Sequence, residues 1–514
     1  MLRFTGRIYT GLLEGATTEA VLVGDDGRIA AAGAEAKRAD VREVVLGERV
    51  VVPGFIDAHV HLEGLAQQLT QLLLADATSL DDVLDRVRER AEASPGNEVI
   101  FGTAWDESDW PEPAIPTRET LDAVAPDRAV VLRRVCGHLW VVNSRALGLI
   151  AVRDDLTDAQ RERLKVVAAA GVLREDDIAL ASSLVVPSTE QVREGLTGVI
   201  AFVLSMGATT LQDMGSLALG GKKGSAFLDA LREMDAAGQL PVRVVASLHR
   251  SAAETDDLAS VLDRVRGKRI HPGPVKVFLD GSIGAQTAAI SQPFDDSPGN
   301  TGQLLWETDA LERVVSRAHA AGLQIALHAI GDRAIGQALD VLEHVLQKRP
   351  RDDHRHRIEH VEIVTPRQIE RMGQLGVIAS MQPNFVGRWQ GEDGLYAKRL
   401  GRRRDAMNPL RSMLDAGVTL AFGSDGMPFG PLYGIRSAMH HTTASESLSF
   451  VEALHAYTQA AAFAGRIDHV TGSVEPGKQA DLVVLSADPA ERDDVTVVAV
   501  FVDGKEAGAG AQNL

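Results

Sequence analysis

The sequence has little that would stabilise a secreted or membrane-bound protein. Its 514 residues include a single cysteine, Cys136, which cannot form a disulfide within the chain. No apolar run approaches the roughly 18 residues of a membrane span. The first 20 residues are interrupted by Gly, Arg and Glu, so no signal peptide is predicted. Together these absences predict a cytoplasmic protein that does not cross a membrane.

Basic residues are scarce relative to acidic ones. The chain has 53 Lys and Arg against 71 Asp and Glu, which gives a net charge of −18. Such a charge opposes binding to phosphate backbones and anionic lipid surfaces, so neither nucleic acid nor a membrane is an expected partner. With 45% hydrophobic and 24% charged residues, the composition is typical of a folded protein with a large core.

Strand-like apolar segments alternate with amphipathic helical segments through the middle of the chain. This alternation is typical of a parallel α/β fold. Eight segments have the character of buried strands: Val50–His61, Ala208–Met214, Val242–Leu248, Val275–Asp280, Gln324–Ile330, Arg357–Ile363, Val377–Gln382 and Val418–Ser424. Among the connecting segments, Asp309–Ala321 and Thr365–Leu375 have the clearest helical pattern. Eight such units predict a TIM-like (β/α)₈ barrel.

The two ends of the chain have a different texture from the middle. Residues 1–52 and 465–514 contain short strand-like pieces separated by Gly and Asp turns. We expect them to pair in one composite β-sandwich domain, which leaves 53–464 for the barrel.

An insertion is expected after the first barrel strand, over residues 65–200. It holds the apolar runs Val99–Gly102 and Ala129–Arg133 and a helix that begins at Ser79, so it predicts an inserted α+β subdomain. The apolar stretch Leu180–Val186 within it is either the core of this subdomain or an interface of a homodimer.

Polar residues follow several of the predicted barrel strands. In a barrel of this kind, the carboxyl ends of the strands meet at one face, where side chains converge. The residues of interest there are His59, His61, Lys276, His328, His360 and Asp425.

The histidines have both a structural and a metal-binding interpretation. His59 and His61 are two residues apart, so on a strand they share one face and could bind a single ion. Alone, such a pair is more often two histidines on a polar loop. His328 and His360 each follow an apolar run, where a lone histidine is more often a satisfied core residue. Their occurrence on consecutive strands, beside the first pair, favours metal ligation.

Asp425 and Lys276 each have both a structural and a functional interpretation. Asp425 is either the N-cap of the next helix or a carboxylate that binds metal and accepts a proton from an attacking water. Lys276 lies among apolar residues, where burial lowers the pKa of an amine. A neutral amine can add carbon dioxide to form a carbamate that bridges two ions. The alternative is an ordinary lysine paired with Asp280 or Glu359.

The chain resembles the amidohydrolase superfamily, and within it amidohydrolase family 3, the YtcJ-like metal-dependent hydrolases that include N-substituted formamide deformylases. The matching stretches cover nearly the whole chain: VVPGFIDAHVHLEG (51–64), GTAWDESDW (102–110), CGHLWVVNSRAL (136–147), ATTLQDMG (208–215), VKVFLDGSIGAQTA (275–288), LHAIGDRAI (327–335), RIEHVEIV (357–364), GSDGMPFGPL (423–432) and GSVEPGKQADLVVL (472–485).

The resemblance implies a barrel with a one- or two-metal site that hydrolyses amide-like C–N bonds of small molecules. The implied ligands of one ion are His59, His61 and Asp425. Those of the second are Lys276, His328 and His360, with Lys276 as a carbamylated bridge. Zinc is the expected metal because imidazole and carboxylate ligands suit it, and iron or manganese are alternatives.

The resemblance also assigns roles in catalysis. Asp425 is the expected proton acceptor, and His328 or His138 the expected support of the tetrahedral intermediate. The family pattern has Asp-Gly-His where this chain has Cys136-Gly137-His138, so the role of the replaced aspartate is in doubt. Cys136 is expected to be a small buried hydrophobe rather than a ligand or nucleophile.

Three functions therefore follow from the sequence. Hydrolysis of a non-peptide amide, N-formyl or N-acyl bond is favoured. A metal-dependent deaminase or other cyclic C–N hydrolase, which needs only one ion, is the alternative. A non-catalytic binding or scaffold protein is disfavoured because all six candidate site residues are present.

Overall fold

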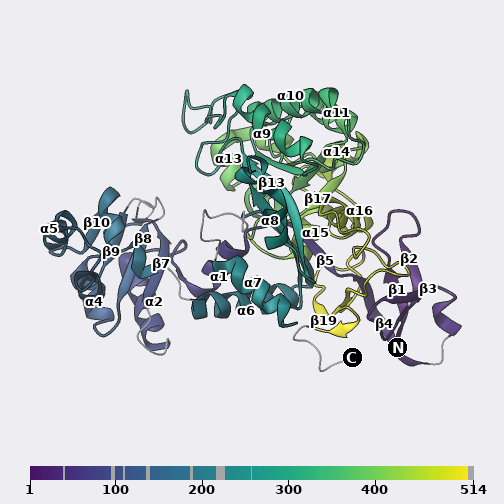
Figure 1. Ribbon diagram of the computed structural model, residues 1–514, viewed down its shortest axis with the longest axis horizontal. Helices are drawn as coiled ribbons and strands as arrows, with labels where there is room; N and C mark the ends of the chain where they lie inside the picture. The colour runs from purple at the N-terminus through teal and green to yellow at the C-terminus, as the bar shows by residue number, and fades with distance from the viewer. Residues whose placement is uncertain are drawn as a thin grey trace. The chain divides into compact units, whose positions relative to one another are not determined.

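The computed structural model describes residues 1–38, 41–93, 99–107, 110–134, 139–185, 189–215, 226–255 and 257–507. The chain divides into two compact units. One comprises Met1–Gly64 with Leu196–Leu514, and the other Leu65–Gly195. The segments of each unit can be followed by colour in Figure 1.

The first unit is built around an eight-stranded parallel sheet whose order in space follows the order in the sequence. Its strands are β5 (Phe55–Val60), β11 (Ala208–Asp213), β12 (Arg243–His249), β13 (Ile270–Phe278), β14 (Ile325–Ala329), β15 (Arg357–His360), β16 (Ile378–Met381) and β17 (Leu420–Phe422). The last strand returns to the first, because the backbone N–H of Asp425 donates to the carbonyl of His59 at 2.8 Å. The predicted TIM-like barrel of eight strands is confirmed.

Helices connect the barrel strands and cover the sheet. They are α6 (Thr189–Ser205), α7 (Ala226–Ala236), α8 (Leu258–Arg264), α9 (Thr308–Ala320), α10 (Asp332–Lys348), α11 (Pro366–Leu375), α12 (Pro383–Trp389), α13 (Leu395–Leu400), α14 (Leu410–Asp415), α15 (Pro431–Met439), α16 (Phe450–Ala456) and α17 (Gln459–Ala464). Both helices predicted most clearly are present, as α9 and α11. Helix α11 starts where expected because Thr365 and Gln368 form a capping box.

The first predicted strand, Val50–His61, is wrong as a single element. It comprises the end of β4 (Arg42–Pro53), in a separate sheet, and β5 in the barrel. The break falls at Gly54, where a Cβ atom would lie 2.2 Å from Oγ1 of Thr209. The chain passes from one sheet to the other at a point that only glycine can occupy.

Both chain ends contribute to a second sheet of seven strands, as expected for a composite β-domain. Its order is β20-β19-β18-β4-β1-β2-β3. The bounds are β1 (Leu2–Tyr9), β2 (Thr17–Val23), β3 (Ile29–Ala32), β4 (Arg42–Pro53), β18 (Leu482–Leu485), β19 (Val497–Val502) and β20 (Lys505–Glu506). Figure 1 shows the purple N-terminal strands and yellow β19 in the same region.

This sheet curls strongly over its own apolar face. Phe4 on β1 and Phe501 on β19 are three strands apart in the sheet order, which is about 14 Å in a flat sheet. Their ring centroids are nevertheless only 5.2 Å apart. The two halves of the sheet therefore face each other across a shared core, as in a sandwich.

The second unit is an α+β domain with a five-stranded sheet of order β10-β9-β8-β7-β6. Its elements are β6 (Leu72–Leu73), β7 (Ile100–Trp105), β8 (Val130–Arg134), β9 (Leu139–Val142), β10 (Val172–Arg174), α2 (Leu80–Ala93), α3 (Arg118–Val124), α4 (Ser144–Ala151) and α5 (Asp158–Val167). The two apolar runs expected in the insertion are β7 and β8. Ser79 caps α2 as predicted, since its Oγ accepts the N–H of Asp82 at 3.1 Å.

The bounds of the two units can be compared with the predicted domain bounds. The second unit spans 65–195, against a predicted insertion of 65–200. The division of the remaining chain at residues 52 and 465 stays a prediction. Leu180 and Ala181 are buried in the core of the second unit, which favours the core interpretation for the described part of that apolar stretch.

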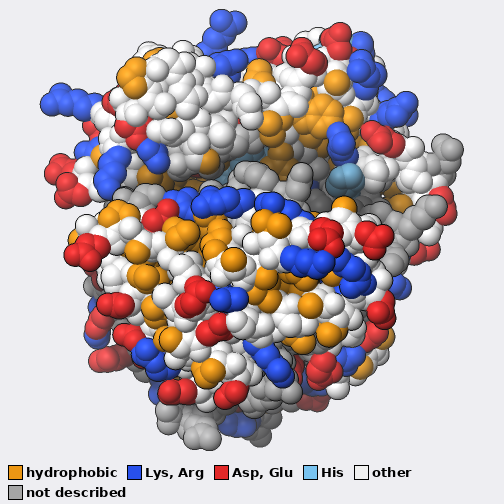
Figure 2. Space-filling model, turned by 90° about the vertical axis from the view of Figure 1, so that its left-hand side faces the viewer, with side chains coloured by type: hydrophobic (Ala, Val, Ile, Leu, Met, Phe, Trp, Pro, Cys, Tyr) orange, Lys and Arg blue, Asp and Glu red, His pale blue; other side chains and the backbone are white. Residues whose placement is uncertain are grey.

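Among the described residues, no helix combines the length and apolar character needed to span a bilayer. Figure 2 shows one face of the molecule, on which Lys and Arg side chains are interspersed with Asp and Glu. The acidic excess is therefore not gathered into one broad patch on this face.

Candidate metal centre

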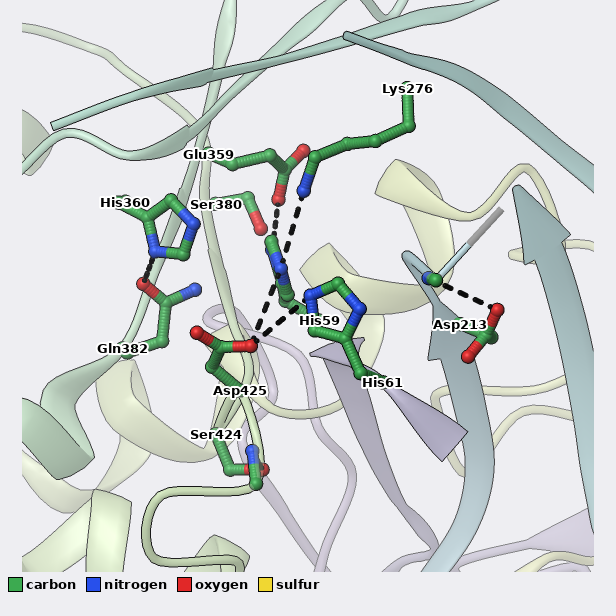
Figure 3. Close-up of polar contacts among 12 residues, drawn as sticks. His59, His61, Asp213, Lys276, Glu359, His360, Ser380, Gln382, Ser424 and Asp425 are labelled. Atoms are coloured by element: carbon green, nitrogen blue, oxygen red, sulfur yellow. Dashed lines mark hydrogen bonds and ion pairs between the residues drawn. The ribbon is translucent and has the colours of Figure 1, made fainter. Parts of the chain in front are cut away.

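The six predicted site residues lie at the carboxyl ends of five barrel strands. Four are on strands: His59 on β5, Lys276 on β13, His328 on β14 and His360 on β15. His61 and Asp425 lie just beyond β5 and β17. Figure 3 shows five of the six, all but His328, pointing toward one another.

His59 is fixed by a buried carboxylate on the opposite side of the barrel. Its Nδ1 lies 2.7 Å from Oε2 of Glu359, and both side chains are fully buried. Since a carboxylate accepts, Nδ1 carries the hydrogen and Nε2 is left with its lone pair. Arg357 donates to Oε1 of the same carboxylate at 2.6 Å and so holds Glu359 in place.

The pKa values agree with this assignment. Burial lowers the pKa of His59 well below its ordinary value, so the ring is neutral. Burial alone would raise the pKa of Glu359, but Arg357 and Lys276 outweigh it and hold this pKa below its usual range. A neutral imidazole hydrogen-bonded to an ionised carboxylate is the usual state of a histidine that binds metal.

Asp425 lies against both histidines of the first strand. Its Oδ1 is 3.8 Å from Nε2 of His59 and 3.4 Å from Nε2 of His61. The Asp425 side chain is only 13% exposed, whereas that of His61 is 34% exposed, so the site opens toward solvent on the His61 side. Asp425 is not an N-cap, because α15 begins only at Pro431.

His360 presents its ring to the same point from β15. Its Nδ1 lies 2.8 Å from Oε1 of Gln382, which leaves Nε2 as the acceptor nitrogen. One nitrogen each of His59 and His360 and one oxygen of Asp425 all lie within 4.8 Å of one another. Both His360 and Asp425 have positive φ, 75° and 54°, a backbone strain that is common at functional sites.

His328 lies next to His360, with ring centroids 4.5 Å apart. Its Nε2 donates to the carbonyl of Gly281 at 3.0 Å. The other nitrogen, Nδ1, is buried and has no hydrogen-bond partner in the described part of the chain. A buried acceptor without a partner is costly, so this atom fits an additional ligand.

Lys276 is 3% exposed, and its Nζ lies 3.4 Å from Nε2 of His59. Burial lowers the pKa of this lysine, although the negative charges of Glu359 and Asp425 oppose the shift. Of the two ion-pair partners considered for Lys276, Asp280 instead accepts the backbone N–H groups of Ala289, Ile330 and Gly331.

The loops that carry the ligands are braced by buried aspartates. Oδ1 of Asp57 accepts the N–H of His59 at 3.0 Å and that of Ser424 at 3.1 Å, which ties the first strand to the last. Oδ1 of Asp213 accepts the N–H of Leu62 at 2.8 Å and so fixes the chain after His61 (Figure 3).

The sequence analysis identified the candidate ligands but not the residues that hold them in place. No supporting role was predicted for Arg357, Gln382, Asp213 or Asp57. The available signal covered only two of them, because Asp57 and Arg357 lie two and three residues before the candidate ligands His59 and His360. Cys136 and His138 lie outside the described residues, so the predicted contact of His138 with substrate stays a prediction.

The donor set is chemically suited to a divalent transition-metal ion. His59 and His360 are buried, each has one nitrogen engaged by an oxygen acceptor, and each turns the other nitrogen toward the Asp425 carboxylate. Imidazole and carboxylate ligands with hydrogen-bonded partners are typical of catalytic zinc sites.

Comparison with known proteins places this site in a family. The model of the amidohydrolase family matches residues 42–507. The YtcJ amidohydrolase of Bacillus subtilis is 31% identical over 513 residues, covering 94% of each chain. The N-substituted formamide deformylase of Arthrobacter pascens is 27% identical, covering 95% of this chain and 94% of its own.

A solved structure agrees over the same length. An uncharacterized metal-dependent hydrolase of Pyrococcus horikoshii matches with a TM-score of 0.76 and 27% identity, covering 96% of this chain and 98% of its own. The shared strands therefore extend through both terminal segments and the barrel. The chain belongs to the amidohydrolase family and is a metal-dependent hydrolase of carbon–nitrogen bonds other than peptide bonds.

Proposed function

We propose that the protein is a zinc-dependent hydrolase that cleaves the amide bond of small N-formyl or N-acyl compounds. The observation that carries the proposal is the convergence of His59, His360 and Asp425 within 4.8 Å. The substrate class is supported by the similarity to the A. pascens enzyme, which acts on N-substituted formamides.

Two groups of ligands are proposed. His59, His61 and Asp425 would hold one ion, since His59 and His61 both approach the same carboxylate oxygen. His328 and His360 would hold a second ion, through Nδ1 of His328 and Nε2 of His360. Lys276 would bridge the two as a carbamate. Its proximity to His59 and its lowered pKa favour the neutral amine that adds carbon dioxide.

Asp425 is the proposed proton carrier. When bound, a zinc ion polarises a substrate carbonyl and lowers the pKa of water. Burial raises the pKa of Asp425 above its ordinary value, while the charge of Lys276 opposes the shift. A carboxylate of raised pKa accepts the proton of the attacking water and returns it to the leaving nitrogen.

The histidines outside the first group have separate proposed roles. Because Nε2–H of His328 already donates to Gly281, this ring fits a ligand better than a donor to the reaction intermediate. Support of the intermediate's oxygen is therefore proposed for His138. We also propose that the enzyme works in the cytoplasm, where a chain with one cysteine needs no disulfide.

The test is turnover of a substrate panel by zinc-loaded protein. N-benzylformamide, N-benzylacetamide and a cyclic amide are compared with cytosine and adenine as deaminase substrates. Release of amine and formate from the formamide, absent in Asp425→Asn, is the expected result. Ammonia release from the bases with no hydrolysis of the amides would overturn the proposal.

A further inference from the structure

Phe278 is an aromatic residue left exposed at the end of β13, at the same level as the candidate ligands. It is 43% exposed, whereas the preceding four residues of the strand are buried. It follows Lys276 by two positions, so both side chains leave the same face of the strand. In the adjacent strand its register partner is His328.

The ring of Phe278 contacts two site residues. Its centroid lies 5.1 Å from that of His328, and Nζ of Lys276 lies 4.7 Å from the centroid. Because the ring is held against buried groups and is still exposed, its open part borders the space in front of the candidate ligands. The exposed part of the ring is therefore available to a substrate bound beside His328 or Lys276.

The backbone around Phe278 is fixed by the segment that precedes α9. The indole N–H of Trp306 donates to the carbonyl of Phe278 at 2.8 Å, and the N–H of Leu305 donates to the carbonyl of Leu279 at 2.8 Å. Leu305 is itself 50% exposed. These backbone hydrogen bonds fix the segment in which Phe278 and Leu305 are exposed. Exposed apolar side chains of this kind commonly line binding pockets.

We propose that Phe278 forms the apolar wall of the substrate pocket and selects substrates with a hydrocarbon substituent, aromatic above all, on the amide nitrogen. The proposal rests on the proposed function. In a formamide the carbonyl carbon carries only a hydrogen, so any hydrocarbon group able to contact the ring must be on the nitrogen side. An aromatic substituent stacks on a phenyl face or edge more favourably than a methyl group does.

The test compares N-benzylformamide with N-methylformamide. Wild-type enzyme loaded with zinc should prefer the benzyl compound in kcat/KM, and Phe278→Ala should reduce this ratio by about tenfold or more. Phe278→Leu should keep most of the preference. Val45→Ala is the matched control, because Val45 is 71% exposed on the terminal sheet and should leave the ratio unchanged. An unchanged ratio in Phe278→Ala would overturn the proposal while leaving the hydrolase function intact.

A second measurement separates the two proposals. Calorimetry of the metal-free protein with each formamide reports binding without turnover. If neither compound is hydrolysed, the proposed function fails. The role of Phe278 as a pocket wall is still supported if N-benzylformamide binds more tightly than N-methylformamide and this difference is lost in Phe278→Ala. Equal binding of both compounds by the wild-type protein would overturn it. Thermal melting of each variant confirms that the exposed substitution leaves the fold intact.

Discussion

Nζ of Lys276 lies 3.4 Å from Nε2 of His59, and both groups are buried. The contact joins β13 to β5, two strands that are not neighbours in the barrel sheet. A positively charged lysine at this distance would repel any cation bound by His59. A metal ion on His59 and an ammonium group on Lys276 cannot both be stable here, so metal binding requires Lys276 to lose its positive charge.

Replacement of Lys276 should change the number of ions that the protein holds. As a carbamate, Lys276 would add one negative charge and two ligand oxygens, so wild-type protein loaded with zinc and bicarbonate should hold two ions per chain. Lys276→Ala should hold at most one, whatever the bicarbonate concentration. Elemental analysis after gel filtration measures this. Two ions in the alanine variant would contradict the bridging role.

Replacement of Asp425 by asparagine should separate metal binding from turnover. The amide keeps an oxygen that can face the ion but cannot accept a proton, so kcat should fall by about 10²–10⁴-fold with metal content largely retained. Asp493→Asn is the control, because that side chain is 70% exposed. Turnover close to that of the wild type in Asp425→Asn would exclude the proton-transfer role.

Replacement of Glu359 by glutamine should weaken metal binding although Glu359 is not itself a ligand. The variant loses the charge that orients His59 and leaves Arg357 buried beside a neutral group. Metal affinity should fall by about 10–100-fold, as is typical when such a supporting carboxylate is changed. Chelator competition measures the affinity.

Glu343→Gln is a matched control for that experiment. Glu343 also pairs with an arginine, Arg371 at 2.7 Å, but its side chain is 40% exposed. The exposed pair should contribute little to stability, and its loss should leave metal affinity unchanged. If the two variants bound metal equally well, the role assigned to Glu359 would be wrong.

Stability should fall in acid because of three buried histidines: His319 in the last turn of α9, and His354 and His356 just before β15. Nδ1 of His356 accepts the N–H of Ile325 at 3.2 Å, so Nε2 carries the hydrogen and donates to Nδ1 of His319 at 2.8 Å. Nδ1 of His354 accepts the N–H of His356 at 2.9 Å. Protonation of these rings would place a hydrogen on nitrogens that already accept.

The pH dependence follows from the direction of the shifts. Burial lowers the pKa of His356 to about 2 and lowers those of His319 and His354. The unfolded chain then binds more protons than the folded one below pH 6.5. Stability should be fully present above that pH and lost as the pH falls, by up to about 1.4 kcal/mol per pH unit for His356. The lowered pKa values of His319 and His354 act in the same direction.

Urea unfolding of the metal-free protein between pH 7.5 and 5 measures this slope. His356→Gln should reduce the slope of the unfolding free energy against pH by the contribution of one proton, because glutamine does not titrate. His344→Gln, at a side chain that is 46% exposed on α10, is the control for a histidine-to-glutamine change outside the buried cluster. An identical slope in wild-type protein and His356→Gln would show that His356 does not titrate on unfolding.

The barrel strands and the candidate ligands were predictable from the sequence for a common reason. A buried parallel strand is a short apolar run, and the polar residues at its carboxyl end lie at one face of the barrel. His59, His328 and His360 all follow this rule. The division of Val50–His61 was signalled only by Pro53-Gly54, a dipeptide that typically marks a turn, because β4 and β5 are both apolar on either side of it.

The supporting contacts could not be predicted because they cross the barrel. Whether Glu359 faces His59 depends on the tilt and stagger of β5 and β15, which are separated by 300 residues in the chain. The two interpretations of Lys276 were equally open for the same reason. The sequence shows that Lys276 is flanked by apolar residues but does not show that its side chain points at His59.

Anomalous diffraction at the zinc edge from crystals of zinc-loaded protein shows whether the strand ends assemble a hydrolytic metal site. A peak is expected within about 2.0–2.2 Å of Nε2 of His59 and of a carboxylate oxygen of Asp425. Absence of any divalent ion from fully loaded protein, or zinc peaks only at sites remote from these residues, would contradict this expectation.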